Sequence, residues 1–195
     1  MMDKKSIETE YKFFIADKKE VIGKLNAIKK ADYMHLFQKT SMYDNKERLM
    51  QKTDGRIRVR VLKIGKEIKK SLSYKKPLSS KNGAKREIEY EIFFSDNDQN
   101  IEKIINKMGF NLASSYERYQ SLWVFNDSKI TLDEYPFANV LEIEGDYNKI
   151  IKIVNRLELN IEKSLTDPID TLFNKWRKKQ GLPFTKFMHF KDFNK

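Results

Sequence analysis

Charged and apolar residues alternate with a period of two in several short segments of the chain, a pattern typical of strands whose two faces meet different surroundings. The alternation is strict from Arg56 to Val61, directly after the turn-forming pair Asp54-Gly55. It recurs over residues 85–93, where glutamates alternate with isoleucines and a tyrosine. Further extended segments are predicted over residues 7–13, 33–44, 71–75, 114–125, 129–134 and 140–145. The sequence therefore predicts about eight strands.

Apolar residues at helical spacing interrupt these strands. Residues 20–31 and 98–108 carry such stripes, the second ending at Gly109, and residues 147–159 and about 166–180 read as two more helices. Helices that cover the apolar strand faces would let the sheet close with its charged face inward. We therefore predict an α+β fold, a closed antiparallel β-barrel of about eight strands that forms a charged tunnel, with helices packed outside.

The length of 195 residues suits a single domain. We expect this domain over residues 1–180, followed by a basic C-terminal extension over 181–195. The chain has no cysteine, which excludes a disulfide framework, a thiolate metal site and a cysteine nucleophile. It also lacks an apolar run of membrane-spanning length and a signal-peptide pattern, so we expect a cytoplasmic, soluble protein without membrane contact.

A net charge of +11 favours anionic partners such as phosphates or nucleic acid, although a lysine-rich composition alone would also produce it. The placement of the charges is more informative, because acids and bases occupy separate predicted strands. The acids are Glu8, Glu10, Asp133, Glu142 and Glu144, and the bases between them are Arg58, Arg60, Lys75 and Arg118. A solvated sheet face explains any one of these strands, but their repetition favours a charged lumen. Carboxylates suit divalent cations and basic groups suit phosphate oxygens, so a metal-bridged polyphosphate would satisfy both sets.

The order of these strands resembles the CYTH-domain, or triphosphate tunnel metalloenzyme, family. Glu8-Thr9-Glu10-Tyr11-Lys12 matches the family's N-terminal Glu-x-Glu-x-Lys strand, and Leu141-Glu142-Ile143-Glu144 matches its closing Glu-x-Glu strand. Between them, in the family's order, stand Gln38 to Asp44, Ile57 to Arg60, Leu72 to Lys75, Lys85 to Glu89, Arg118, and Leu132-Asp133. The resemblance covers roughly residues 6–175.

The resemblance implies a role for each matching residue. The residues expected to bind a triphosphate-containing small molecule are Lys12, Arg58, Arg60, Lys75, Lys85 and Arg118, with Lys12 and Lys75 as catalytic residues. The residues expected to hold Mg²⁺ or Mn²⁺ are Glu8, Glu10 and Glu144, assisted by Glu89, Asp133 and Glu142. The implied activity is metal-dependent hydrolysis of a triphosphate by a monomer or homodimer.

One position departs from the family pattern. The sixth strand commonly carries Lys-x-Arg, whereas this chain has Tyr116-Glu117-Arg118, so one expected phosphate-binding lysine is missing. We expect Lys85 or Lys39 to compensate. Aromatic residues such as Tyr116, Trp123 and Trp176 would stack on an organic group or, more commonly, pack beneath a helix.

The resemblance leaves the reaction open. Candidate substrates for hydrolysis are inorganic tripolyphosphate, thiamine triphosphate, nucleoside triphosphates and an RNA 5′-triphosphate end. An alternative is cyclisation of ATP to cyclic AMP, as in class IV adenylate cyclases. We favour hydrolysis because nothing in the sequence reads as an adenine pocket. A non-catalytic polyphosphate- or nucleotide-binding module is a further alternative, and nucleic-acid binding based on charge alone ranks third.

Overall fold

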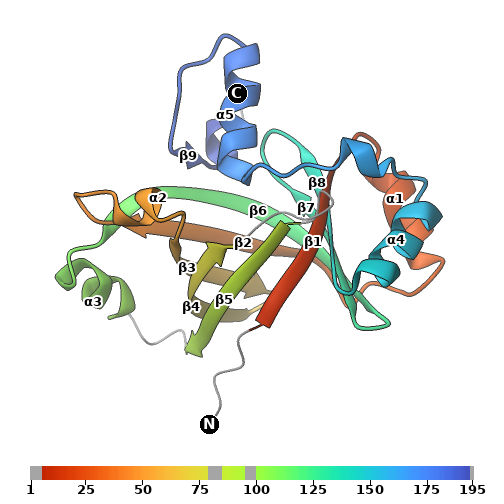
Figure 1. The fold of residues 1–195 in the computed structure, drawn as a ribbon, viewed down its shortest axis with the longest axis horizontal. Helices are drawn as coiled ribbons and strands as arrows, with labels where there is room; N and C mark the ends of the chain where they lie inside the picture. The colour runs from red at the N-terminus through yellow and green to blue at the C-terminus, as the bar shows by residue number, and fades with distance from the viewer. Residues whose placement is uncertain (1–5, 79–84, 95–99, 194–195) are drawn as a thin grey trace.

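Eight antiparallel strands form one curled sheet in the part of the chain that the computed structural model describes, which is residues 6–78, 85–94 and 100–193, with backbone alone at 6–8, 33–34 and 85–86 (Figure 1). The strands are β1 (Ser6–Ile15), β2 (Tyr33–Asp44), β3 (Arg56–Ile64), β4 (Glu67–Pro77), β5 (Lys85–Phe94), β6 (Asn111–Phe125), β7 (Ser128–Glu134) and β8 (Asn139–Glu144). A two-residue strand, β9 (Phe187–Met188), adds in parallel to β6. The predicted α+β class is confirmed.

The strands lie in the order β2-β3-β4-β5-β1-β8-β7-β6, and β2 also pairs with β6. The register sets polar and charged residues of neighbouring strands opposite one another. Thr40 lies opposite both Arg60 on β3 and Tyr116 on β6, while Glu10 on β1 lies opposite Glu144 on β8. Because side chains alternate between the two faces of a strand, this register collects the charged positions on the concave face.

The main core lies on the convex side of β1, β6, β7 and β8. There α1 (Lys18–Asn26) and α4 (Tyr147–Arg156) cover the sheet, as Figure 1 shows. Ile150, Ile153 and Val154 follow helical spacing and bury one face of α4. Burying an aliphatic side chain of this size contributes about 1.5–3 kcal/mol, so this layer holds the strands that carry Lys12 and Glu142 in place.

Aspartates fix the start of both of these helices. The Asp17 side chain accepts hydrogen bonds from the backbone N–H groups of Lys19 and Glu20, and the Asp146 side chain caps α4 in the same way. Such caps satisfy backbone donors that have no partner within the helix.

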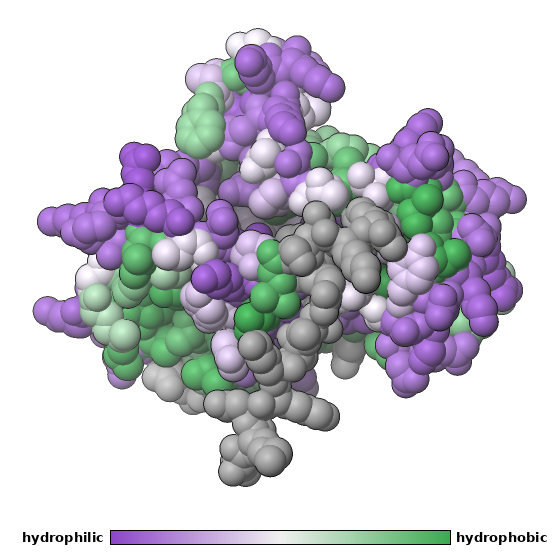
Figure 2. Space-filling view, viewed as in Figure 1, coloured by the Kyte–Doolittle hydropathy of each residue, from purple (hydrophilic) through white to green (hydrophobic). Residues whose placement is uncertain are grey.

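A second layer covers the convex side of β2 and β3. Ile105 of α3 (Ile101–Lys107) packs on Tyr43 and Val59, and the four-residue helix α2 (Leu49–Lys52) lies before β3. Figure 2 shows apolar surface near α3, where Met108 is 69% exposed, whereas the outer surfaces of α4 and α5 are mostly hydrophilic.

The helix α5 (Ile169–Lys179) and the residues after it pack at one end of the curled sheet. Phe173 of α5 lies in a cluster with Tyr135, Val140 and Met188. The Ser115 hydroxyl lies 2.7 Å from Nε2 of His189, and the Phe190 N–H donates to Glu117 at 3.2 Å. Residues after 180 therefore contact β6, and the division of the chain at residue 180 stays a prediction.

Several element bounds differ from the predicted ones. The helix expected over 20–31 spans Lys18–Asn26, and the helix expected over 98–108 begins at Ile101. Helix α2, strand β9 and the 3₁₀ turns Ile161–Lys163 and Phe190–Asp192 were not predicted. In the described ranges, the structure contains no helix long and apolar enough to cross a membrane.

Candidate functional site

The concave face of the sheet encloses a cavity of about 940 Å³ whose walls are charged. Strands β1 and β8 contribute carboxylates and one lysine, and strands β3, β4 and β6 contribute most of the bases. The predicted site residues that line this cavity are Glu10, Lys12, Arg58, Arg60, Lys75, Glu89, Arg118, Glu142 and Glu144. The structure thus brings together residues from the two ends of the sequence and from its centre.

Strict alternation on β3 places its arginines on the cavity wall. Arg56, Arg58 and Arg60 line the cavity, while Val59 between them is 2% exposed and packs in the convex-side layer. The apolar positions bury against α3, so the neighbouring arginines must face the concave side. Farther along the same strand, Leu62 and Ile64 continue this lining as apolar residues.

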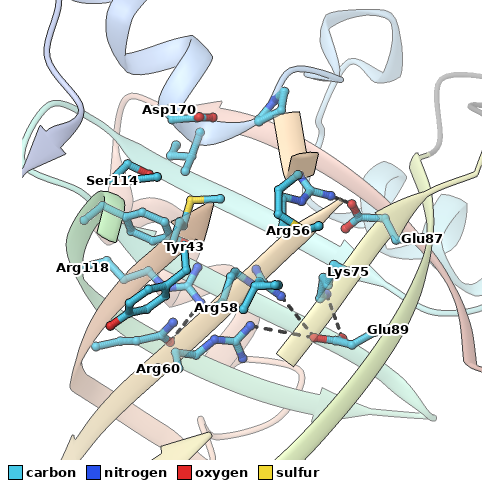
Figure 3. Close-up of a pocket in the computed structure, with 18 of the residues that line it drawn as sticks. Tyr43, Arg56, Arg58, Arg60, Lys75, Glu87, Glu89, Ser114, Arg118 and Asp170 are labelled. Atoms are coloured by element: carbon cyan, nitrogen blue, oxygen red, sulfur yellow. Dashed lines mark hydrogen bonds and ion pairs between the residues drawn. The ribbon is translucent and has the colours of Figure 1, made fainter. Parts of the chain in front are cut away.

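Glu89 of β5 stands among bases of β3 and β4 (Figure 3). Its carboxylate lies 3.2 Å from Nη2 of Arg58, 2.8 Å from Nζ of Lys75 and 4.0 Å from Nη2 of Arg60. All four side chains are less than one-fifth exposed. The carboxylate therefore acts as an internal counter-ion for the basic wall.

Two further glutamates of β5 extend this arrangement. Glu91 accepts from Arg60 at 3.3 Å and from the Ser71 hydroxyl at 2.8 Å. Glu87 forms an ion pair with Arg56 near the end covered by α5. Sequence reasoning named Lys85 and Glu89 as site residues on this strand and missed Glu87 and Glu91, although the alternation over 85–93 puts both on the same face as Glu89.

Lys12 belongs to the opposite wall. It is 6% exposed, and its ammonium group lies 3.0 Å from Glu142 and 3.7 Å from Glu10. Burial alone would lower the pKa of Lys12, but Glu142 and Glu10 outweigh it and hold this pKa above its usual value. Beside these two carboxylates, a protonated Lys12 is suited to neutralise anions.

Arg118 of β6 is held by polar side chains of neighbouring strands. It forms an ion pair with Asp133 and donates to Gln38 at 3.1 Å and to the Tyr135 hydroxyl at 3.1 Å. Asp133 also accepts from Gln120 at 2.7 Å. Burial raises the pKa of Asp133 to about 6, although Arg118 opposes this effect. Gln38 and Gln120 were missed as site residues, since neutral amides give no charge signal in the sequence.

Asp133 differs from the other predicted acids in its position. It is 0% exposed and forms an ion pair with Arg118, whereas Glu10, Glu142 and Glu144 reach the cavity. The contacts of Asp133 show it orienting Arg118. Its predicted part in metal binding stays a prediction.

The side chains of Glu8 and Lys85 lie outside what the structure describes, so their predicted roles also stay predictions. Lys39, the other residue expected to compensate for the missing lysine, is exposed and does not line the cavity. Successive side chains of a strand point to opposite faces. Gln38 and Thr40 on either side of Lys39 point inward, so Lys39 points outward.

The acidic wall of the cavity, formed by Glu10, Glu142 and Glu144, offers the donor atoms that a hard divalent cation prefers. Glu10 and Glu144 are cross-strand partners, and Glu142 lies on the same face of β8. Carboxylate oxygens are the preferred ligands of Mg²⁺ and Mn²⁺. Among the described side chains, no three acidic or histidine groups are already close enough to form a cation site, and their present partners include Lys12 and Lys129.

Comparison with known proteins gives a consistent result. The sequence model of the CYTH domain matches residues 6–188. A search of curated proteins found no significant match.

Several solved structures are similar in fold. A protein of Vibrio parahaemolyticus named as a candidate adenylate cyclase has 13% identity and a TM-score of 0.75, covering 87% of this chain and 99% of its own. A Pyrococcus horikoshii protein has 21% identity and a TM-score of 0.69, with coverage of 87% and 99%. A candidate adenylyl cyclase of Hippeastrum, described as having a dominant triphosphatase activity, has 14% identity and a TM-score of 0.52, with coverage of 96% and 94%.

Proposed function

Because the chain belongs to the CYTH domain family, we propose that its cavity binds a triphosphate compound together with Mg²⁺ or Mn²⁺ and hydrolyses it. One observation carries the proposal. Arg58, Arg60, Lys75 and Arg118 converge on one cavity whose facing wall bears Lys12, Glu10, Glu142 and Glu144. A metal-bridged polyphosphate is complementary to both walls.

The pairing of the strands supports a closed tunnel as the form of this site. β2 pairs with β3 along one edge and with β6 along the other, while β1 joins β5 to β8. In a closed barrel every wall of the lumen can contribute to one ligand. An extended chain of three phosphates would then contact several strands at once.

The basic wall has unused hydrogen-bonding capacity. Among the described residues, Nε of Arg60 and Nε of Arg118 are buried without a hydrogen-bond partner. Buried donors of this kind are costly, and a phosphate oxygen is the acceptor that an arginine binds best. Bound triphosphate would therefore satisfy donors that the protein leaves open.

The acidic wall would hold the metal through Glu10, Glu142 and Glu144, with Glu8, Glu89 and Asp133 as the further predicted ligands. A divalent cation there supplies electrophilic stabilisation of phosphoryl oxygens and lowers the pKa of bound water. The chain's own residues position the substrate: Lys12 and Lys75 neutralise charge, and the arginines fix its direction. Water then adds to the terminal phosphorus, the bridging P–O bond breaks, and orthophosphate leaves the shortened chain.

Cyclisation of ATP is the second candidate. It is favoured by the apolar residues Leu36, Leu62, Ile64 and Leu122, which line part of the same cavity and could contact a nucleoside. The name of the Vibrio parahaemolyticus fold neighbour, a candidate adenylate cyclase, agrees with this alternative. The direction in which the triphosphate lies decides between the two reactions.

Product analysis tests the proposal. The pure protein is incubated with tripolyphosphate, thiamine triphosphate, ATP or triphosphorylated RNA, each with Mg²⁺, Mn²⁺ or a chelator. We expect metal-dependent release of orthophosphate. Cyclic AMP with pyrophosphate would transfer the assignment to the cyclase, and binding without product would favour the non-catalytic module.

The position of Glu89 leads to a separate prediction. We expect Glu89→Gln to bind tripolyphosphate about tenfold more tightly in the absence of metal, a gain of about 1.4 kcal/mol, because three largely buried cations lose a competing acceptor. Isothermal titration calorimetry measures this change. Glu162→Gln, on an exposed 3₁₀ turn, serves as the control and should bind like the unmodified protein. Weaker binding by Glu89→Gln would show that the carboxylate orders the basic wall more than it competes with the ligand.

A further inference from the structure

Tyr116 occupies a position on the cavity wall among the arginines. It lies on β6 two residues before Arg118, lines the cavity and is 9% exposed. The register places Tyr116 opposite Thr40 on β2, which in turn lies opposite Arg60 on β3. The phenol therefore belongs to a row of side chains that crosses three neighbouring strands and ends at Arg60, one of the residues proposed to bind phosphate.

The charges around this phenol are predominantly positive. Burial alone would raise the pKa of Tyr116, but Arg58, Arg118 and Arg60, together with a hydrogen bond from Thr40, outweigh it and lower this pKa. The phenol of Tyr135 also packs against it, with its ring centroid 5.9 Å away, and Asp170 and Lys186 line the same cavity. The arginines that face Tyr116 are the same ones that line the cavity.

Packing fixes the orientation of the ring. Tyr116 belongs to the cluster of Tyr135, Val140, Phe173 and Met188 under α5, and Met42 packs against the same cluster. A ring held on its apolar side has little freedom to turn its hydroxyl away from the cavity. The hydroxyl is thus pre-organised, which lowers the entropy lost when it binds a ligand.

We propose that the Tyr116 hydroxyl is part of the anion site and donates a hydrogen bond to a phosphate oxygen held by Arg58, Arg60 and Arg118. This inference rests on the proposed function. At this position, where the family commonly has a lysine, the chain would use a neutral hydrogen-bond donor. The site would then bind a triphosphate with one fewer positive charge. The neutral phenol donates, whereas the phenolate cannot.

The proposal fixes the direction of the pH dependence. A bound polyanion opposes ionisation of the phenol, so the pKa of Tyr116 is higher in the complex than in the free protein. Affinity is therefore complete below the pKa of the free protein and falls as the pH rises through it. Without the hydroxyl, this part of the pH dependence disappears.

Calorimetric titration with inorganic tripolyphosphate, without metal and from pH 7 to about 10, tests the inference on Tyr116→Phe. A hydrogen bond to a charged group contributes about 1.5–3 kcal/mol, so we expect binding at neutral pH to weaken about tenfold or more. We also expect the variant to lose the part of the alkaline decline that the phenol causes. The control is Tyr119→Phe, since Tyr119 lies three residues farther along β6, packs against Phe37 and Phe190, and does not line the cavity.

A second measurement does not depend on the variant's folding. Tyrosinate absorbance of the unmodified protein is followed against pH with and without tripolyphosphate, and we expect the ligand to move one ionisation to higher pH. If the protein binds tripolyphosphate but Tyr116→Phe binds equally well and no ionisation moves, the inference is wrong and the proposed function stands. If the unmodified protein does not bind tripolyphosphate at any pH, the proposed function fails and the inference fails with it.

Discussion

Replacing Arg118 with methionine should lower the free energy of unfolding by about 3–5 kcal/mol at neutral pH. Methionine keeps much of the side-chain volume but removes the charge partner of Asp133, which is 0% exposed and bonded to Gln120 on its other oxygen. Leaving a buried carboxylate without a charge partner is among the most destabilising changes a protein can undergo. Denaturant unfolding of the pure variant measures the loss.

The same variant should show a characteristic pH dependence. Burial already raises the pKa of Asp133 to about 6 in the intact protein, and removing Arg118 removes the largest effect that lowers it. Because this pKa lies above that of an aspartate in the unfolded chain, about 3.9, ionising Asp133 costs stability. The cost is absent below about pH 4 and complete above the folded-state pKa, so the deficit of the variant should shrink as the pH is lowered.

Two further variants decide whether Asp133 causes the loss. The double variant Arg118→Met/Asp133→Asn should recover most of the stability, since no charge is then left buried. Arg60→Met should lose less, because its partner Glu91 is 22% exposed and can be hydrated. An equal deficit at pH 5 and pH 8, or no recovery in the double variant, would contradict this account.

Converting Glu10 and Glu144 to glutamine should reduce metal-dependent kcat/KM by about 10³-fold. The two carboxylates are cross-strand partners on the acidic wall, so the double change removes two of the proposed metal ligands and keeps their shape. Loss of electrophilic stabilisation worth several kcal/mol accounts for the size of the effect. Orthophosphate release measures turnover, and Mn²⁺ titration calorimetry independently measures whether metal affinity falls.

The control for this change is Glu162→Gln, an acid-to-amide change on an exposed turn. It should leave both turnover and Mn²⁺ affinity unchanged. Thermal unfolding of each variant must remain cooperative for the comparison to hold. Undiminished metal-dependent turnover in Glu10→Gln/Glu144→Gln would place the metal elsewhere in the protein.

The sequence allowed much of the sheet to be predicted, because alternation is a property of each strand by itself. Residues 56–61 show this most clearly, since the valine between two arginines is buried and both arginines reach the cavity. Short elements such as α2 and β9 have too few residues to carry a periodic signal. They form through tertiary contacts, as the pairing of Phe187 and Met188 with β6 illustrates.

Most residues of the candidate site could be predicted from the sequence, but the contacts between them could not. Charge and parity predict that Arg58, Lys75 and Glu89 lie on one face. They do not predict that Glu89 contacts both bases. Likewise, no sequence pattern distinguishes Asp133, which is fully buried beside Arg118, from Glu142, which reaches the cavity. Those distinctions depend on sheet curvature and register, which arise from pairings between segments far apart in the chain.

The two-residue period of the strands also limits which length changes the protein can tolerate. Deleting one residue near the start of β3 would turn Arg58 and Arg60 toward α3 and bring Val59 into the cavity. This part of the cavity wall would then be apolar instead of basic. The turn at Asn126 and Asp127, where both residues have positive φ, lies outside the paired segments of β6 and β7. Length variation among related chains should therefore be confined to such connections, and insertions there can diversify the surface without changing the chemistry of the cavity.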